Sequence, residues 1–167
     1  MSVAFRRESD EEHLEPKFET PIPPGPNLVT ARGLALIRGR VADITAQLEK
    51  LSDETAIKAA KRDLRYWQTR EITAELVPVP SGAAVQIGTV VTFLHNGKRR
   101  SLTIVGDDEA DPAIGLVSFS APLCRALMNA APGDFLDFGG TEDAIEVLQI
   151  AVTGAPTTAP VRADEAD

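Results

Sequence analysis

The sequence is poor in cysteine and in aromatic residues, and it has no long hydrophobic run. One cysteine in 167 residues, Cys124, excludes a disulfide within the chain and is typical of a reducing compartment. No apolar run approaches the about 20 residues that a transmembrane helix needs. The first 19 residues also lack the apolar core of a signal peptide. We therefore expect a soluble, cytoplasmic protein with no membrane association.

Positive charge is also in short supply, with 17 basic against 25 acidic side chains. Residues 27–77 are slightly basic, whereas residues 78–150 carry nine acidic and four basic side chains. An acidic C-terminal half is a poor match for a nucleic-acid backbone and suits a basic protein surface better. We expect any contact with nucleic acid to be indirect, through a protein partner.

Both ends of the chain have the composition of unfolded extensions. Residues 1–26 are polar and end in the sequence PIPPGP, whose prolines block helix and sheet ladders. Residues 154–167 are rich in alanine, proline and threonine. These segments predict a disordered arm and a disordered tail.

Apolar residues recur at steps of three and four in two neighbouring segments, which is the pattern of a helical seam. The first segment contains Leu34, Ile37, Val41, Ile44, Leu48 and Leu51, and the second contains Ile57, Ala60, Leu64 and Trp67. Thr30 is placed to cap the first helix. Residues 27–77 therefore predict an antiparallel helical hairpin that turns at about residues 51–55, with Ile72 and Leu76 extending the apolar side of the second helix.

The period changes to two after residues 78–82. Two strand-like runs flank Asn96-Gly97, a dipeptide typical of tight β-hairpins. Further strands are expected at 116–120, 135–139 and 144–152, with one short helix that Ser120 would cap. Residues 78–153 thus predict an α+β domain in which one short helix packs on an antiparallel sheet.

Three stretches of this domain carry a family resemblance: IGTVVTF at 87–93, IVGDDEADPAIGLVSFSAPLCRAL at 104–127 and GDFLDF at 133–138. In order and spacing they resemble the GreA/GreB family of bacterial transcript cleavage factors. The resemblance implies an FKBP-like fold for the C-terminal domain and a coiled-coil hairpin before it. It also implies binding to RNA polymerase, with the domain on the rim of the secondary channel and the hairpin presenting acids to the catalytic magnesium ion.

The hairpin tip departs from the family pattern. Cleaving members carry a tip close to Asp-Leu-x-Glu-Asn-Ala-Glu-Tyr, whereas this chain has LSDETAIKAA at 51–60, with adjacent acids and neither Asn nor Tyr. Each helix of the hairpin is also about eleven residues shorter than in cleaving members, which places the tip roughly 16 Å short of the position that their tip reaches. Such a short hairpin resembles the regulator of nucleoside diphosphate kinase type. We therefore expect an elongation regulator without strong transcript cleavage activity.

Two sets of site residues follow, each with a plainer structural interpretation. Ser120, Ala121 and Pro122 match the family loop that contacts the polymerase, and they also form an ordinary helix start. Asp53 and Glu54 could pair on a magnesium ion as weak catalytic candidates, or they could cap and begin the second helix.

Two charged clusters also need an explanation. The acidic loop at 107–111 lacks the spacing of a calcium site and has no nucleophile beside it, which leaves a solvated turn or an acidic surface near the polymerase-binding face. The basic stripe of the second helix is either a solvated face or lies near RNA in the channel. It consists of Lys58, Lys61, Arg62, Arg65 and Arg70.

Other function classes fit less well. The alternative closest to a non-cleaving elongation regulator is a factor that stimulates transcript cleavage through Asp53 and Glu54. An FKBP-like prolyl isomerase would need more aromatic residues than this domain has, and a nucleoside diphosphate kinase needs a phosphorylated histidine that neither His13 nor His95 is placed to supply. An adaptor with another partner stays open. We expect a monomer that is not an enzyme and that carries no cofactor or metal.

Overall fold

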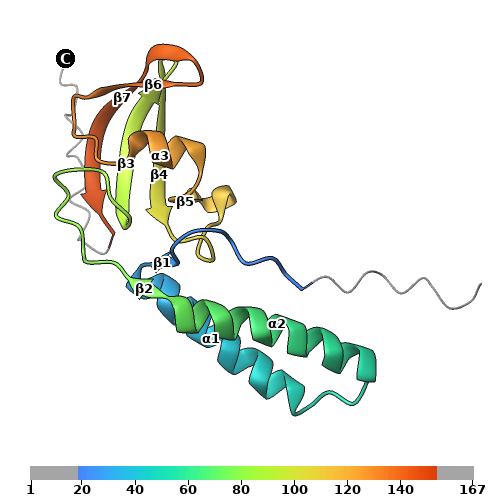
Figure 1. The fold of residues 1–167 in the computed structure, drawn as a ribbon. Coiled ribbons are helices and arrows are strands. Elements are labelled where there is room, and N and C mark those ends of the chain that lie inside the picture. The colour runs from blue at the N-terminus through green and yellow to red at the C-terminus, as the bar shows by residue number, and fades with distance from the viewer. Residues whose placement is uncertain (1–18, 154–167) are drawn as a thin grey trace, which may run out of the picture.

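The computed structural model describes residues 19–153, which form a helical hairpin joined to a sheet domain (Figure 1). The hairpin consists of α1 (Ala31–Leu48) and α2 (Glu54–Thr73), and its turn lies at 49–53. A parallel ribbon of β1 (Leu28–Val29) and β2 (Glu75–Leu76) closes its base. The predicted hairpin is confirmed, but its turn lies about two residues earlier than expected, so Leu51 belongs to the turn and not to the first helix. The predicted tail and the first 18 residues of the predicted arm lie outside the described residues.

The two helices begin where the sequence supplies a capping side chain. The Thr30 hydroxyl accepts a hydrogen bond from the Gly33 amide (3.0 Å), and the Asp53 carboxylate accepts one from the Ala56 amide (2.9 Å). Each bond satisfies one of the amides that a helix start leaves unpaired. The predicted cap at Thr30 is therefore confirmed.

The seam between the helices is only partly shielded from water. Ile37 and Ala60 are buried, whereas Val41, Ile44 and Leu64 are half-buried. Two helices alone cannot enclose all of their apolar side chains, so the hairpin depends on the sheet domain at its base. Neither helix is long and apolar enough to cross a bilayer, and this holds for every helix within residues 19–153.

The prediction that Ile72 and Leu76 extend the apolar side of α2 was wrong, because they are 84% and 58% exposed. Ile72 lies two positions after Arg70, and therefore on nearly the opposite side of the helix. The side of α2 that meets the sheet domain carries Arg70 instead, which is 1% exposed.

The sheet domain has five strands in the order β5-β4-β3-β7-β6. Their bounds are β3 Thr89–His95, β4 Lys98–Val105, β5 Leu116–Ser118, β6 Phe135–Phe138 and β7 Thr141–Val152. All neighbours are antiparallel except β5, which pairs in parallel with β4, so the predicted antiparallel sheet is corrected to a mixed one. The loop at 106–115, which contains a short 3₁₀ helix (Pro112–Ile114), carries the chain back beside β4.

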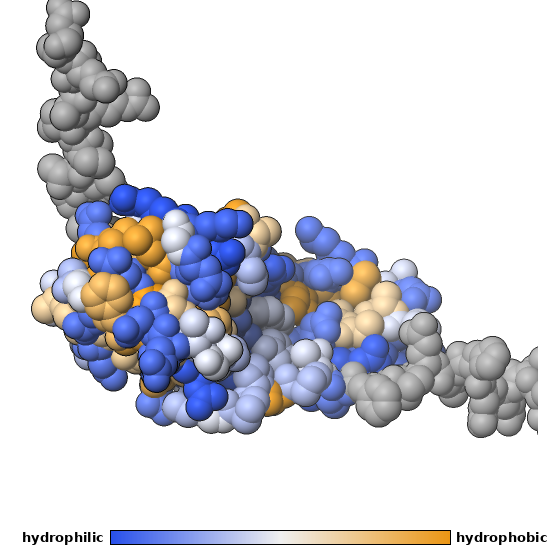
Figure 2. Space-filling view, turned by 90° about the horizontal axis from the view of Figure 1, so that it is seen from above, coloured by the Kyte–Doolittle hydropathy of each residue, from blue (hydrophilic) through white to orange (hydrophobic). Residues whose placement is uncertain are grey.

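The core lies between the sheet and the short helix α3 (Pro122–Leu127), which covers one face of the sheet (Figure 1). It contains Val85, Val91, Phe93, Leu102, Ile104, Cys124, Leu127, Ala130, Ile145 and Val147. Burial raises the pKa of the Cys124 thiol to about 11, so this cysteine is a packing residue rather than a reactive one. On the face seen in Figure 2, apolar patches lie among hydrophilic surface.

Substitution of two isoleucines, one buried in the seam between α1 and α2 and one exposed, tests the packing of the hairpin. Ile37→Ala should lower the free energy of unfolding by about 2–5 kcal/mol, because the side chain is fully buried. Ile72→Ala makes the same chemical change at an exposed position and should stay within about 0.5 kcal/mol of the parent. Urea unfolding of the two variants measures both, and equal losses would contradict the assigned seam.

Candidate functional site

The acidic loop after β4 lies at the junction of the hairpin and the sheet domain. The side chains of Asp107, Asp108 and Glu109 are only 13%, 5% and 4% exposed. A solvated turn and an acidic surface facing a partner are therefore both ruled out for these three residues. Their charges are turned inward, toward the base of the hairpin.

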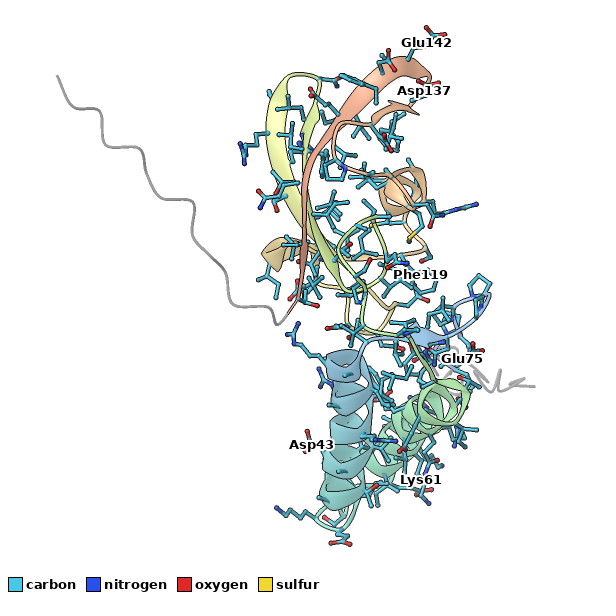
Figure 3. The ribbon with its side chains drawn as sticks, turned by 90° about the vertical axis from the view of Figure 1, so that its left-hand side faces the viewer. Asp43, Lys61, Glu75, Phe119, Asp137 and Glu142 are labelled. Carbon is cyan, nitrogen blue, oxygen red and sulfur yellow. The ribbon has the colours of Figure 1, made fainter. Side chains whose placement is uncertain are left out.

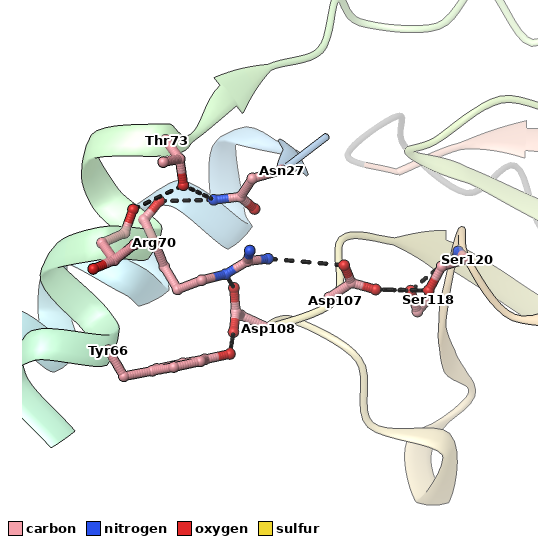
Figure 4. A network of polar contacts seen from close by, with 9 residues as sticks. Asn27, Tyr66, Arg70, Thr73, Asp107, Asp108, Ser118 and Ser120 are labelled. Atoms are coloured by element: carbon pink, nitrogen blue, oxygen red, sulfur yellow. Dashed lines mark hydrogen bonds and ion pairs between the residues drawn. The ribbon is translucent and has the colours of Figure 1, made fainter. Parts of the chain in front are cut away.

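Asp108 binds two side chains of α2. Its carboxylate accepts hydrogen bonds from the Tyr66 hydroxyl (2.5 Å) and from Arg70 Nε (2.5 Å) (Figure 4). Burial and then the bond to Asp108 raise the pKa of Tyr66, which keeps the phenol protonated as a donor. Tyr66 and Arg70 are four residues apart, so they project from the same side of the helix.

Arg70 is not part of a solvated basic stripe. Its guanidinium is buried, with Nη2 lying 3.8 Å from the Asp107 carboxylate in addition to the Nε bond to Asp108. Two acids beside one cation offset its charge in a position that water does not reach. Only Lys58, Lys61, Arg62 and Arg65 remain on the outer side of α2.

Glu109 ties the loop to the other helix. Its carboxylate accepts a hydrogen bond from the Thr30 hydroxyl (2.6 Å) and pairs with Arg32 Nη1 (3.4 Å). The same Thr30 hydroxyl caps α1, so the cap and the domain contact share one oxygen atom. A carboxylate near the first turn also complements the helix dipole.

The backbone at this junction is too close for larger residues. A Cβ atom added to Gly106 would lie 2.5 Å from the Leu28 carbonyl oxygen, and one added to Gly33 would lie 2.9 Å from Glu109 Oε2. Glycine at these two positions lets the loop approach β1 and α1. Beside them, buried Asn27 donates to the Arg70 carbonyl oxygen (2.8 Å) and to the Thr73 hydroxyl (3.2 Å), which secures the end of α2.

Asp107 also connects the junction to the predicted polymerase-binding residues. Its Oδ1 atom accepts hydrogen bonds from the hydroxyls of Ser118 (2.5 Å) and Ser120 (2.7 Å) (Figure 4). Ser120 and Pro122 are exposed and Ala121 is half-buried. The N-cap of α3 is Ala121, without a side-chain cap, so the predicted capping role of Ser120 is wrong: its hydroxyl is used by Asp107.

Asp53 and Glu54 lie at the far end of the hairpin. Asp53 caps α2, and Glu54 forms an ion pair with Lys58 (2.9 Å) one turn further along. The structure therefore places both acids in the helix-start roles that the sequence offered as the plainer interpretation. Within residues 19–153, no group of three or more His, Cys, Asp or Glu side chains is arranged to hold a metal ion.

A pocket of about 440 Å³ lies beside the junction, between α1, the linker after β2 and the sheet. Most of its lining is apolar, and it includes Leu76, Val77, Val79, Ile87 and Leu116. Thr30, Arg32 and Glu109 supply its polar edge.

Comparison with known proteins identifies the family. The family model described as "Transcription elongation factor, GreA/GreB, C-term" matches residues 80–152. Transcription elongation factor GreA of Helicobacter acinonychis is 31% identical over 121 residues, which cover 65% of this chain and 74% of that protein. The chain belongs to the GreA/GreB family. The resemblance noted in the sequence is confirmed.

Further GreA/GreB relatives cover more of the chain. Transcription elongation factor GreA of Pseudomonas putida is 28% identical over 137 residues, or 80% of this chain and 82% of that protein. Among solved structures, GreA factor homolog 1 (Gfh1) of Thermus thermophilus is 21% identical, with a TM-score of 0.35, over 76% of this chain and 99% of that one. A GreA/GreB factor of Nitrosomonas europaea is 20% identical, with a TM-score of 0.36, over 76% and 98%.

Most of the junction could not be foreseen from the sequence. Within the DDEAD loop nothing indicated which acid meets which helix, and Asn27 and Tyr66 were not singled out. The one usable signal was the four-residue spacing of Tyr66 and Arg70, which places them on a common side of α2.

The ion pairs of Arg70 generate a prediction with a matched control. Arg70→Met should lower the free energy of unfolding by about 3–5 kcal/mol, because it leaves Asp108 buried without a cation. Arg38 pairs with Glu71 (3.6 Å) on the surface and is 64% exposed, so Arg38→Met should cost less than about 1 kcal/mol. Chemical denaturation measures both variants, and similar losses would show that the junction contributes little.

The close approach of Gly106 to the Leu28 carbonyl oxygen generates another prediction. Gly106→Ala should lower the free energy of unfolding by roughly 1–3 kcal/mol, since the new methyl group meets backbone that cannot move aside. Gly39 lies within α1 with open space around it, so Gly39→Ala should raise stability by up to about 1 kcal/mol. Thermal or urea unfolding distinguishes the opposite signs, and a stabilising Gly106→Ala would contradict the packing described.

Proposed function

We propose that this protein binds RNA polymerase at the rim of the secondary channel and regulates elongation without strong transcript cleavage activity. Membership of the GreA/GreB family supports the polymerase as partner. Ser120, Ala121 and Pro122 supply the docking loop in this proposal. The exposed positions of Ser120 and Pro122 leave them accessible to a partner.

The observation that carries the proposal is the connection from this loop to the hairpin through Asp107. One oxygen of the carboxylate holds Ser118 and Ser120, and the other faces Arg70 of α2. A partner that fixes the loop would therefore also fix the direction of the hairpin. A factor that must aim a rod into a channel needs a link of this kind between its docking surface and the rod.

The tip supports the second half of the proposal. Helices of 18 and 20 residues extend roughly 27–30 Å, which fits a hairpin too short to reach a catalytic metal ion from the rim. A carboxylate must approach magnesium to about 2.0–2.1 Å to bind it. Asp53 already uses its carboxylate to cap α2, so metal binding there would compete with the start of the helix.

Cleavage assays on a backtracked polymerase complex with labelled RNA test this function. The full chain alone should give little cleavage above background, and it should inhibit cleavage by a GreA factor that carries the complete tip. Ser120→Ala combined with Pro122→Ala should weaken that inhibition, whereas Asp53→Asn with Glu54→Gln should leave it unchanged. Asn retains the helix cap, so the second variant removes charge without removing the cap.

Two results would contradict the proposal in different ways. Efficient cleavage by the chain alone, lost in the Asp53→Asn/Glu54→Gln variant, would identify the two acids as a working pair and establish the cleavage-factor alternative. Failure to bind polymerase or to inhibit the GreA factor would remove the docking proposal and favour an adaptor with another partner.

A further inference from the structure

The outer side of α2 carries a basic surface that the proposed function leaves unexplained. Lys58, Lys61, Arg62 and Arg65 are spaced at three and four residues, so they project from one side of the helix. Together with Glu19 they line a shallow depression of about 260 Å³. Lys61 lies on the opposite side of the hairpin from Asp43 of α1 (Figure 3).

Glu19, the first residue that the structure describes, belongs to the N-terminal arm and contacts this basic surface. Glu19 forms an ion pair with Arg65 and is the one acid that lines the depression. Their hydrogen bond lowers the pKa of Glu19 and raises that of Arg65, so both groups stay charged. Lys58 pairs with Glu54, and the positive charge of Arg62 also lowers the pKa of Glu19.

The chain that precedes Glu19 has the complementary charge. Residues 8–15 read ESDEEHLE and contain five acids and no lysine or arginine. Eleven extended residues reach up to about 36 Å, whereas Lys58 and Arg65 are about 10 Å apart along the helix axis. The acidic segment can therefore reach every cation of the basic surface from the position of Glu19.

We propose that residues 8–15 bind the basic surface of α2 within the same molecule and cover it in the free protein. The segment then acts as an internal competitor: any anionic ligand of this surface must displace it. This inference does not depend on the proposed function, since the contact forms without a partner. We assign the chain's own arm as the occupant because Glu19 of the arm already pairs with Arg65 on this surface. A second exposed basic cluster lies on the sheet domain and has no such contact with Glu19; it consists of Lys98, Arg99 and Arg100.

A spin label on the arm tests the contact in the full chain. Ser9→Cys carries the nitroxide, and Cys124 is kept because its buried thiol is shielded from the labelling reagent. The label should broaden the backbone amide signals of residues 58–65 and leave those around Asp43 and residues 98–100 sharp. The broadening should be lost in about 1 M NaCl, where the Debye length is about 3 Å.

Paired variants separate this contact from general attraction between charges. Lys61→Gln with Arg62→Gln should abolish the broadening at residues 58–65, whereas Arg99→Gln with Arg100→Gln should leave it intact. Broadening at residues 98–100, no broadening, or broadening indifferent to Lys61→Gln/Arg62→Gln would each overturn the proposal. So would broadening that appears when spin-labelled and isotope-labelled chains are mixed, because a second copy would then be the occupant.

Retention on heparin gives an independent measurement. Replacing the acids of residues 8–15 by their amides should increase retention, because the basic surface becomes free. In the Lys61→Gln/Arg62→Gln background the same replacement should increase it much less. An equal increase in both backgrounds would mean that the arm acts only through net charge, and it would overturn the proposed contact.

Discussion

The arrangement of the two parts of this protein depends on one buried cation. Arg70, in the last turn of α2, lies inside the junction, where Asp108 binds its Nε atom and Asp107 lies beside Nη2. A buried guanidinium is costly unless acids surround it, and a buried carboxylate is equally costly without its cation. The hairpin and the sheet domain therefore supply opposite charges to each other. A displaced hairpin would leave the guanidinium and the carboxylates either exposed to water or buried without a partner.

The rest of the junction follows from the need to bring the acidic loop this close. Gly106 lets the loop lie against the Leu28 carbonyl oxygen, and Gly33 leaves room for the Glu109 carboxylate. Glu109 then shares the hydroxyl that caps α1. The start of α1 and the end of α2 are thus held by neighbouring acids of a single loop. The short hairpin, whose seam is only half-buried, gains a fixed base from this contact.

The same loop gives the docking proposal its mechanical basis. Asp107 has two carboxylate oxygens and uses them on different elements, the serine loop before α3 and Arg70 of the hairpin. The pocket lies at the base of the hairpin, whereas the tip and the basic surface are linked by the ion pair between Glu54 and Lys58. The acids at the tip serve the helix start, whereas those at the base serve the junction, which explains why acids of the same chemistry have unrelated roles.

The sequence by itself determined the long helices and most strands of the sheet domain, because periodicity and capping are local properties, but it did not indicate β1, β2 or the 3₁₀ helix. The steps of three and four predicted α1 and most of α2, Asn96-Gly97 predicted the β3–β4 turn, and the motifs at 87–138 predicted the family.

Tertiary structure alone decided which charges are buried. Arg70 resembles the neighbouring basic residues of α2 in sequence, and the acids at 107–109 resemble any solvated turn. Their burial depends on where a loop some 40 residues away meets the helix, and likewise β5 became parallel through the path of that loop. A local pattern carries no information about that meeting, because the partner atoms come from distant parts of the chain.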